Sequence, residues 1–310
     1  MAPLVIATRG SKLALAQARW VAGRLAGLRP GLEVELEVIK TQGDKITAVP
    51  LAEVGGKGLF VKEIEEALLA GQAQLAVHSM KDVPAELPPG LIIAGVSPRE
   101  DVRDVLVSRR WGSLEELPAG ARVGTSSLRR RAQLLAQRPD LEVVPLRGNV
   151  ETRLRKLEAE GLDAVILAAA GLVRLGLEGV VTQYLPLETL LPAVGQGALG
   201  LECREDDDAT RELAAALADP AAAAAVEAER TFLARLEGGC QVPIAAHAVL
   251  EGDRLWLRGL VADLEGRPLV RAQGRAPRGE AAALGRRVAE EVLDKGGREI
   301  LARLYGEAPR

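Results

Sequence analysis

The stretch Leu4–Ser11, with the sequence LVIATRGS, holds a strand, a turn and a helix start in immediate succession. Its first five residues are apolar enough for a short buried strand, and Ser11 is of a type that caps helix N-termini. Apolar residues then recur at helical spacing as far as Leu28, and residues 33–39 alternate between polar and apolar. That alternation predicts a half-buried strand. The chain therefore begins with strand, helix and strand.

The same succession recurs further along the chain. A strand at residues 121–124 precedes Ser126 or Ser127, either of which can cap a helix, and further strands are expected at 142–144 and 164–167. Alternation of strands and helices predicts parallel sheets with helices on both faces. We therefore expect an α/β protein with two similar lobes and a central cleft.

The last strand of the tandem pattern comes late, at residues 199–203, and we expect it to return to the first sheet. The chain then changes to Ala-rich helices, three strands near 244–250, 255–261 and 269–272, and two final helices, which is typical of a small α+β domain. The predicted domains are residues 1–97 with 198–215, residues 98–197, and residues 220–310.

Composition excludes several classes of protein. The chain has 310 residues, a net charge of −3 and 2% aromatic residues, a balance that argues against a general nucleic-acid binder. Cys203, Cys240, His78 and His247 are too few for a disulfide framework or a Cys/His metal site, so no metal is predicted. No apolar stretch is long enough for a membrane span, and a reducing cytoplasm is the expected compartment.

Arginines cluster where the predicted strands end. The stretch Gly124–Arg131 (GTSSLRRR) places hydroxyls and guanidinium groups at a helix start, which favours bound anions. Arg147 and Arg153 follow the next strand, Arg174 follows a later one, and Arg9 occupies the matching turn of the first lobe. Such clusters suit a ligand with several carboxylates. The alternative is a solvated helix face.

Two further turns carry candidate chemistry. His78–Pro84 (HSMKDVP) ends a strand with Lys81 beside Asp82, so Asp82 is either a general acid/base or cation stabiliser, or one half of a surface ion pair. His78 is better explained as a hydrogen-bonded strand residue than as a catalyst. The glycine-rich stretch 55–58 lacks the spacing of a nucleotide-binding loop, and a loop covering the cleft, with Lys57 and Phe60 at its edge, fits better.

The junction Leu236–Pro243 (LEGGCQVP) separates the helical run from the final domain. Its two glycines let the backbone turn sharply, and its proline resists helix continuation. Cys240 is then either incidental to a helix C-cap or a thiol presented as an attachment point or nucleophile.

Taken together, these stretches resemble the porphobilinogen deaminase (hydroxymethylbilane synthase) family across essentially the whole chain. The matching motifs are long and occur in the family's order: ATRGS (7–11), VGGKGLF (54–60), HSMKDVP (78–84), GTSSLRR (124–130), LRGN (146–149), PAVGQG (192–197) and LEGGCQVP (236–243). The resemblance implies two lobes like those of periplasmic binding proteins and a third domain that carries the cofactor.

The family condenses four porphobilinogen molecules head to tail, releases ammonia and, after hydrolysis, yields hydroxymethylbilane. Its primer is a dipyrromethane cofactor that the enzyme builds from its own substrate, and the resemblance implies a thioether to Cys240. It also implies a cytoplasmic monomer that binds porphobilinogen and neither nucleic acid nor membrane.

The resemblance assigns a role to each matching position. Asp82 is implied to be catalytic, through hydrogen bonds to pyrrole N–H groups and stabilisation of the cation left when ammonia departs. The implied cofactor-binding residues besides Cys240 are Lys81, Ser127, Arg129, Arg130, Arg147 and Gly148. The implied substrate-binding residues are Arg9, Ser11, Lys57, Phe60, Thr125, Arg153, Arg174 and Gln196.

Some features depart from the family or fit other classes. Glu53 stands where some members have a lysine, and Arg131 and Arg155 receive no role. A two-lobed protein that binds an anionic ligand without catalysis would share the fold and the arginines, but it would need neither Asp82 nor an exposed Cys240. A nucleic-acid-binding protein is disfavoured by the net charge and the scarcity of stacking aromatics.

Overall fold

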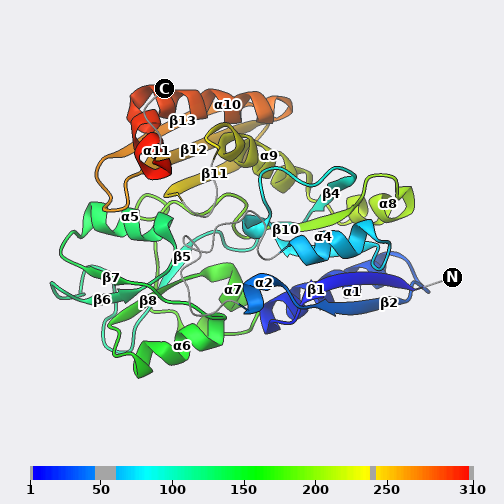
Figure 1. Cartoon of the computed structure of the whole chain (residues 1–310), viewed down its shortest axis with the longest axis horizontal. Helices are drawn as coiled ribbons and strands as arrows, with labels where there is room; N and C mark the ends of the chain where they lie inside the picture. Colours follow the sequence, from blue (N-terminus) through cyan, green and yellow to red (C-terminus); the bar gives the residue numbers. More distant parts are fainter. Residues whose placement is uncertain (1–2, 46–60, 238–241, 307–310) are drawn as a thin grey trace. The chain divides into compact units, whose positions relative to one another are not determined.

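The computed structural model describes residues 3–45, 61–237 and 242–306, which contain three β-sheets (Figure 1). Contacts divide the chain into two compact units. The first unit contains the described residues of 1–48, 56–100 and 195–223, and the second contains those of 101–194 and 224–310.

The sheet of the first unit has the strand order β2-β1-β3-β10-β4. Ala18, Val21 and Leu25 of helix α1 pack on one face together with α8, and Ile64 and Leu68 of α4 pack on the other. The elements are β1 (Leu4–Arg9), α1 (Lys12–Leu28), β2 (Val34–Ile39), α2 (Gln42–Lys45), α4 (Lys62–Leu69), β3 (Leu75–Ser79), the 3-10 turn η1 (Met80–Asp82), β4 (Leu91–Val96), β10 (Leu199–Arg204) and α8 (Asp208–Ala216).

The first sheet of the second unit has the order β7-β6-β8-β5-β9. Its central strand β8 is apolar throughout because alternate residues face two cores: Ala164 and Ile166 pack with α5, and Val165 and Leu167 pack with α6 and α7. The elements are β5 (Asp104–Val107), β6 (Arg122–Gly124), α5 (Leu128–Gln137), β7 (Glu142–Val144), α6 (Val150–Ala159), β8 (Ala164–Ala168), α7 (Ala169–Val173), η2 (Glu178–Val180) and β9 (Gln183–Tyr184).

The two α/β sheets share one topology, and that topology corrects the sequence prediction. Four strands of each sheet run in the same direction and one is reversed: β10 is antiparallel to β3 and β4, and β5 is antiparallel to β8 and β9. The predicted parallel sheets are therefore mixed sheets, each with one reversed strand. Local periodicity identifies a strand but not its direction, which depends on the end of the sheet at which the chain enters. The expected return of residues 199–203 to the first sheet is confirmed, with β10 lying between two strands.

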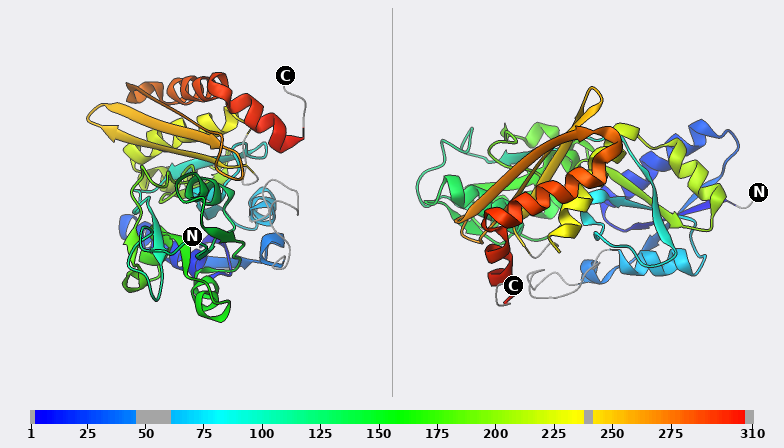
Figure 2. Two further views of the ribbon diagram at one scale, coloured as in Figure 1. Left: turned by 90° about the vertical axis from the view of Figure 1, so that its left-hand side faces the viewer. Right: turned by 90° about the horizontal axis from the view of Figure 1, so that it is seen from above.

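A third, antiparallel sheet, β11-β12-β13, lies in the second unit and is covered by helices (Figure 2). Phe232 of α9 packs against β12 at Gly259, where a Cβ would lie 2.4 Å from the ring, so only glycine fits there. The third strand is longer than expected. The elements are α9 (Pro220–Arg235), β11 (Ile244–Glu251), β12 (Arg254–Ala262), β13 (Leu269–Pro277), η3 (Arg278–Glu280), α10 (Ala281–Val292), the π-helical η4 (Leu293–Gly297) and α11 (Arg298–Tyr305).

The predicted fold class is confirmed: two α/β sheets of the kind expected for the lobes, and a small antiparallel sheet with helices. The three-domain boundaries and the central cleft remain predictions. Among the described residues, none of the helices combines the length and apolar character required for a bilayer span.

Candidate functional site

One group of predicted site residues lies in the first unit, where β1 and β3 end side by side. These strands are parallel, so their carboxyl ends meet at one edge of the sheet, the usual ligand-binding edge of open α/β sheets. Arg9 ends β1, and the Ser11 hydroxyl accepts a hydrogen bond from Ala14 N at 3.2 Å, which caps α1 as predicted. Asp82 lies in η1, directly after β3.

A small cavity of about 60 Å³ lies among these strand ends. Its polar lining comes from Arg9, Ser11, Gln17, His78, Ser79 and Asp82. Gln17 Nε2 donates to Ser79 Oγ at 3.0 Å, which joins α1 to the end of β3. Asp82 is exposed and Arg9 is half-buried, so a carboxylate and a guanidinium both border one accessible hollow. The structure therefore brings Arg9, Ser11 and Asp82 together, as the sequence predicts.

The turn that carries Asp82 is fixed by the loop before β10. Met80 N donates to Ala198 O at 3.0 Å, and Met80 is buried. Gly195, at φ +72°, lies so close that a Cβ there would be 3.1 Å from the Met80 carbonyl carbon. This glycine is required both by its backbone conformation and by the close approach. Gln196 is buried in the same loop, and Lys81 is half-buried in η1.

Three titratable side chains are buried in the same unit: His78, Glu202 and Glu65. His78 Nε2 and Glu202 Oε2 form a 2.8 Å hydrogen bond, which confirms His78 as a hydrogen-bonded strand residue. The Oε1 atoms of Glu202 and Glu65 are buried without a hydrogen-bond partner among the described residues. Burial, reinforced by the nearby charge of Glu202, raises the pKa of Glu65 to about 7. Glu65 is consequently protonated in the folded protein at a pH where it would be ionised in the unfolded chain.

We expect Glu65→Gln to change the pH dependence of stability. Because the folded pKa exceeds the unfolded value of 4.5, the folded state holds the proton more tightly. The contribution of Glu65 to stability is therefore greatest below pH 4.5 and is lost as the pH rises toward 7. A neutral Gln avoids this loss, so the advantage of the variant over wild type in the free energy of unfolding, measured by urea denaturation, should be larger at pH 8 than at pH 5 by about 2.5 kcal/mol.

The control is the exposed neighbour Glu66, whose Oε1 lies 4.0 Å from Lys62 Nζ. Glu66→Gln should shift the free energy of unfolding by nearly the same small amount at both pH values. A Glu65→Gln difference from wild type that is equal at pH 5 and pH 8 would show that Glu65 is ionised in the folded protein.

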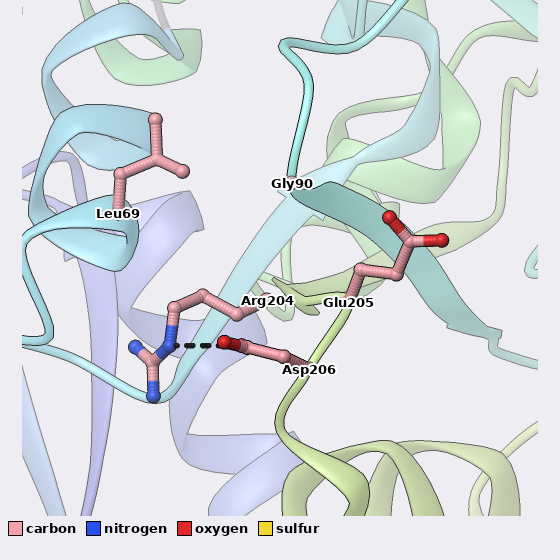
Figure 3. Close-up of a pocket in the computed structure, with 5 residues that line it drawn as sticks. All are labelled: Leu69, Gly90, Arg204, Glu205 and Asp206. Atoms are coloured by element: carbon pink, nitrogen blue, oxygen red, sulfur yellow. Dashed lines mark ion pairs between the residues drawn. The ribbon is translucent and has the colours of Figure 1, made fainter.

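A larger hollow of about 440 Å³ lies at the opposite end of the same sheet (Figure 3). It is lined by Leu69, Gly90, Arg204, Glu205 and Asp206. Arg204 is engaged there, with bonds to the carbonyls of Leu68 and Ala73 and an ion pair with Asp206 at 3.6 Å. This hollow holds none of the predicted site residues and is remote from the carboxyl ends of β1 and β3.

Another group of predicted site residues lies in the second unit, where the parallel strands β6, β7 and β8 end. Thr125 follows β6, and its Oγ1 accepts a hydrogen bond from Ser127 N at 3.2 Å. Ser127 occupies the N-cap position of α5, while the Ser126 hydroxyl donates to Leu146 O at 2.9 Å. The turn after β7 is thereby tied to the turn after β6.

The turn after β7 needs its glycine. Gly148 has φ +119°, and a Cβ there would lie 2.6 Å from Thr152 Cγ2. Asn149 caps α6, and Arg153 Nε donates back to Gly148 O at 2.8 Å. Arg147 is half-buried beside this turn, and Arg174 is half-buried at the C-terminus of α7. These residues all follow the carboxyl ends of strands of one sheet, as the sequence predicts.

Arg129 and Arg130 differ from the other arginines because both are only 5% exposed. Arg129 Nη1 donates to Asp104 Oδ2 at 2.7 Å and to Leu191 O at 2.6 Å. Arg130 donates to Asp104 Oδ1 at 2.7 Å and to Ile166 O at 2.9 Å. One buried carboxylate therefore faces two guanidinium groups.

Several predicted residues lie outside the described residues: Cys240, Lys57, Phe60 and the divergent position Glu53. Arg131, which received no role from the sequence, reaches the β12–β13 loop through Glu265 Oε1 at 2.6 Å. Arg155 is exposed on α6.

Gln17, Ser79 and Asp104 are not among the site residues predicted from the sequence. A signal existed for two of them. Gln17 is a polar residue on the otherwise apolar buried side of α1, and Asp104 is a carboxylate that opens a fully buried strand. Buried polar groups need partners, so both positions predict a specific contact.

Comparison with known proteins identifies the family of this chain. The family model described as "Porphobilinogen deaminase, dipyromethane cofactor binding domain" matches residues 4–212, and the model "Porphobilinogen deaminase, C-terminal domain" matches residues 223–294. Porphobilinogen deaminase of Syntrophotalea carbinolica is 59% identical over 97% of this chain and 96% of its own. That of Geobacter sulfurreducens is 58% identical over 97% of this chain and 95% of its own.

The fold and these matches define an enzyme of tetrapyrrole biosynthesis that uses a dipyrromethane cofactor. The chain belongs to the porphobilinogen deaminase family, whose activity is that of hydroxymethylbilane synthase. The matches cover nearly the full length of the relatives, so the non-catalytic alternative is set aside.

Proposed function

We propose that Asp82 is the catalytic residue of this deaminase and that Arg9 and Ser11 bind the acid groups of porphobilinogen beside it. The observation that carries this assignment is the cavity at the ends of β1 and β3, which all three residues line. Porphobilinogen carries carboxylates and a pyrrole N–H, and the cavity offers a cation, a hydroxyl and a carboxylate acceptor to match them.

The chemistry requires a negative charge at this place. Departure of ammonia leaves a positive charge on the substrate pyrrole, and a carboxylate within about 4 Å stabilises that charge by about 4 kcal/mol at an effective dielectric of 20. Asp82 would also accept a hydrogen bond from the pyrrole N–H and so orient the ring. The buried Met80 and Gly195 hold the turn that carries Asp82, which keeps its carboxylate in place.

The second unit fits a ligand rich in carboxylates. Arg129 and Arg130 bring two positive charges to the single carboxylate of Asp104, which leaves a net positive charge in a buried place. Arg130 Nε is buried without a hydrogen-bond partner among the described residues. An additional acceptor would satisfy both the charge and this donor, so the residues present fit the dipyrromethane.

We assign the dipyrromethane to Lys81, Ser127, Arg129, Arg130, Arg147 and Gly148, with Cys240 as the covalent attachment. When bound, the cofactor supplies the pyrrole carbon to which the first substrate is joined. Lys57, Phe60, Thr125, Arg153, Arg174 and Gln196 are assigned to the substrate and the growing chain. We further propose three domains with the boundaries given above, a monomeric state and a cytoplasmic location.

Arg147→Leu tests the anion-binding role of the second unit. A charge-assisted hydrogen bond contributes about 1.5–3 kcal/mol, so loss of this guanidinium should slow cofactor assembly in apoprotein by about tenfold or more. Assembly would be followed by intact mass after adding porphobilinogen to apoprotein produced without it.

The control is Arg155→Leu, which removes an exposed arginine from α6. This variant should assemble the cofactor at the wild-type rate. Equal rates for wild type and Arg147→Leu would remove Arg147 from the cofactor site.

A further inference from the structure

Asp104 is the one carboxylate that both buried arginines contact. It is the first residue of β5, it is fully buried, and each of its oxygens accepts a hydrogen bond of 2.7 Å from a different guanidinium group. None of the sequence motifs that match the family includes this residue.

The contacts fix the direction of both guanidinium groups. Arg129 is held between Asp104 and the Leu191 carbonyl, and Arg130 between Asp104 and the Ile166 carbonyl. The Leu191 backbone is itself clamped, because Gln133 of α5 accepts from its N–H at 2.8 Å and donates to its carbonyl at 3.0 Å. Each arginine thus has one charged and one neutral acceptor, and only the charged acceptor is shared.

The carboxylate stays ionised in this environment. Burial alone would raise the pKa of Asp104, but the charges and hydrogen bonds of Arg129 and Arg130 outweigh it and hold that pKa well below its usual range. The buried group therefore consists of two cations and one anion.

We propose that Asp104 is a positioning residue for the cofactor site, which fixes Arg129 and Arg130 and leaves one net positive charge for a carboxylate of the dipyrromethane. This inference rests on the proposed role of the two arginines in binding the cofactor. Asp104 itself does not touch the ligand. It aligns the two groups that do, and it keeps their mutual repulsion from turning them apart.

A purely structural role is the competing explanation, and it predicts different measurements. If Asp104 only stabilises the fold, its replacement lowers the amount of folded protein. The molecules that do fold then assemble the cofactor with the same half-saturating porphobilinogen concentration as wild type. If Asp104 positions the arginines, a folded variant needs more porphobilinogen for assembly.

The test uses apoprotein of Asp104→Asn and Asp104→Glu, with the folded fraction determined by circular dichroism. The fraction of molecules that carry the two-pyrrole mass is measured by intact mass at increasing porphobilinogen concentration. For Asp104→Asn we expect the half-saturating concentration to rise at least tenfold. Asp104→Glu retains the charge that the fold needs, but its extra methylene displaces both guanidinium groups, so we expect a smaller rise in a stably folded protein.

The matched control is Asp140→Asn, which removes the carboxylate that Arg138 contacts at 2.8 and 2.6 Å at the other end of α5. It should leave the half-saturating concentration unchanged. The positioning role would be overturned if folded Asp104→Glu assembled the cofactor with the half-saturating porphobilinogen concentration of wild type. The same result for Asp104→Asn, where that variant folds, would also overturn it. Arg130→Leu distinguishes failure of the cofactor contact from failure of the positioning role. If Arg130→Leu also assembles the cofactor normally, Arg130 does not contact the cofactor. If Arg130→Leu is impaired while the Asp104 variants are not, only the positioning role of Asp104 is excluded.

Discussion

Replacing Asp82 with Asn is expected to lower turnover by about a thousandfold or more while the protein still folds. The amide has the same shape but no charge, so it cannot stabilise the positive charge that develops on the substrate as ammonia leaves. A loss of about 4 kcal/mol of charge stabilisation corresponds to that factor in rate. Asp82 is exposed at the end of η1, so its replacement should leave the thermal unfolding midpoint nearly unchanged.

Glu86→Gln is the matched control because it removes another exposed carboxylate four residues further along. Product formation from porphobilinogen, measured with both variants fully loaded with cofactor, separates catalysis from cofactor assembly. Near-normal turnover of Asp82→Asn would remove Asp82 from the catalytic role, whatever its effect on assembly.

Cys240→Ser is expected to abolish both the covalent cofactor and product formation. A serine hydroxyl is far less nucleophilic than a thiolate and cannot form the thioether, so no primer is held. The chain offers its own control in Cys203, which is buried in β10, where burial raises the pKa of its thiol to about 11. A thiol in that state is unreactive at neutral pH.

Cys203→Ala should therefore keep the added mass and most of the turnover. The measurement is the intact mass of each denatured variant together with its rate of product formation. Added mass in Cys240→Ser, or its loss in Cys203→Ala, would move the attachment point away from Cys240.

Local sequence patterns predict much of the fold because each element carries its own signal. The strand ends at Arg9, Gly124 and Val144 lie where the apolar runs end, and Ser11 and Asn149 cap the helices that follow. Strand direction was not predicted in the same way. The patterns of residues 104–107 and 199–204 fit a buried strand running in either direction, and only their partners across the sheet show them to be antiparallel.

Some contacts among the candidate site residues can likewise be predicted from the sequence, and others cannot. Arg9, Ser11 and Asp82 come from turns that directly follow adjacent parallel strands, so their proximity follows from the topology. Asp104 lies 25 residues before Arg129 in the sequence, and their contact depends on an antiparallel strand beside β8. No local sequence pattern predicts the contact between Asp104 and Arg129.

The covalent attachment of the dipyrromethane is tested by the intact mass of the purified wild-type enzyme after denaturation. We predict a mass that exceeds the sequence mass by two linked pyrrole units, because the dipyrromethane survives denaturation as a thioether on Cys240. A mass equal to that of the sequence alone, in a preparation that converts porphobilinogen to product, would exclude a covalent cofactor on Cys240.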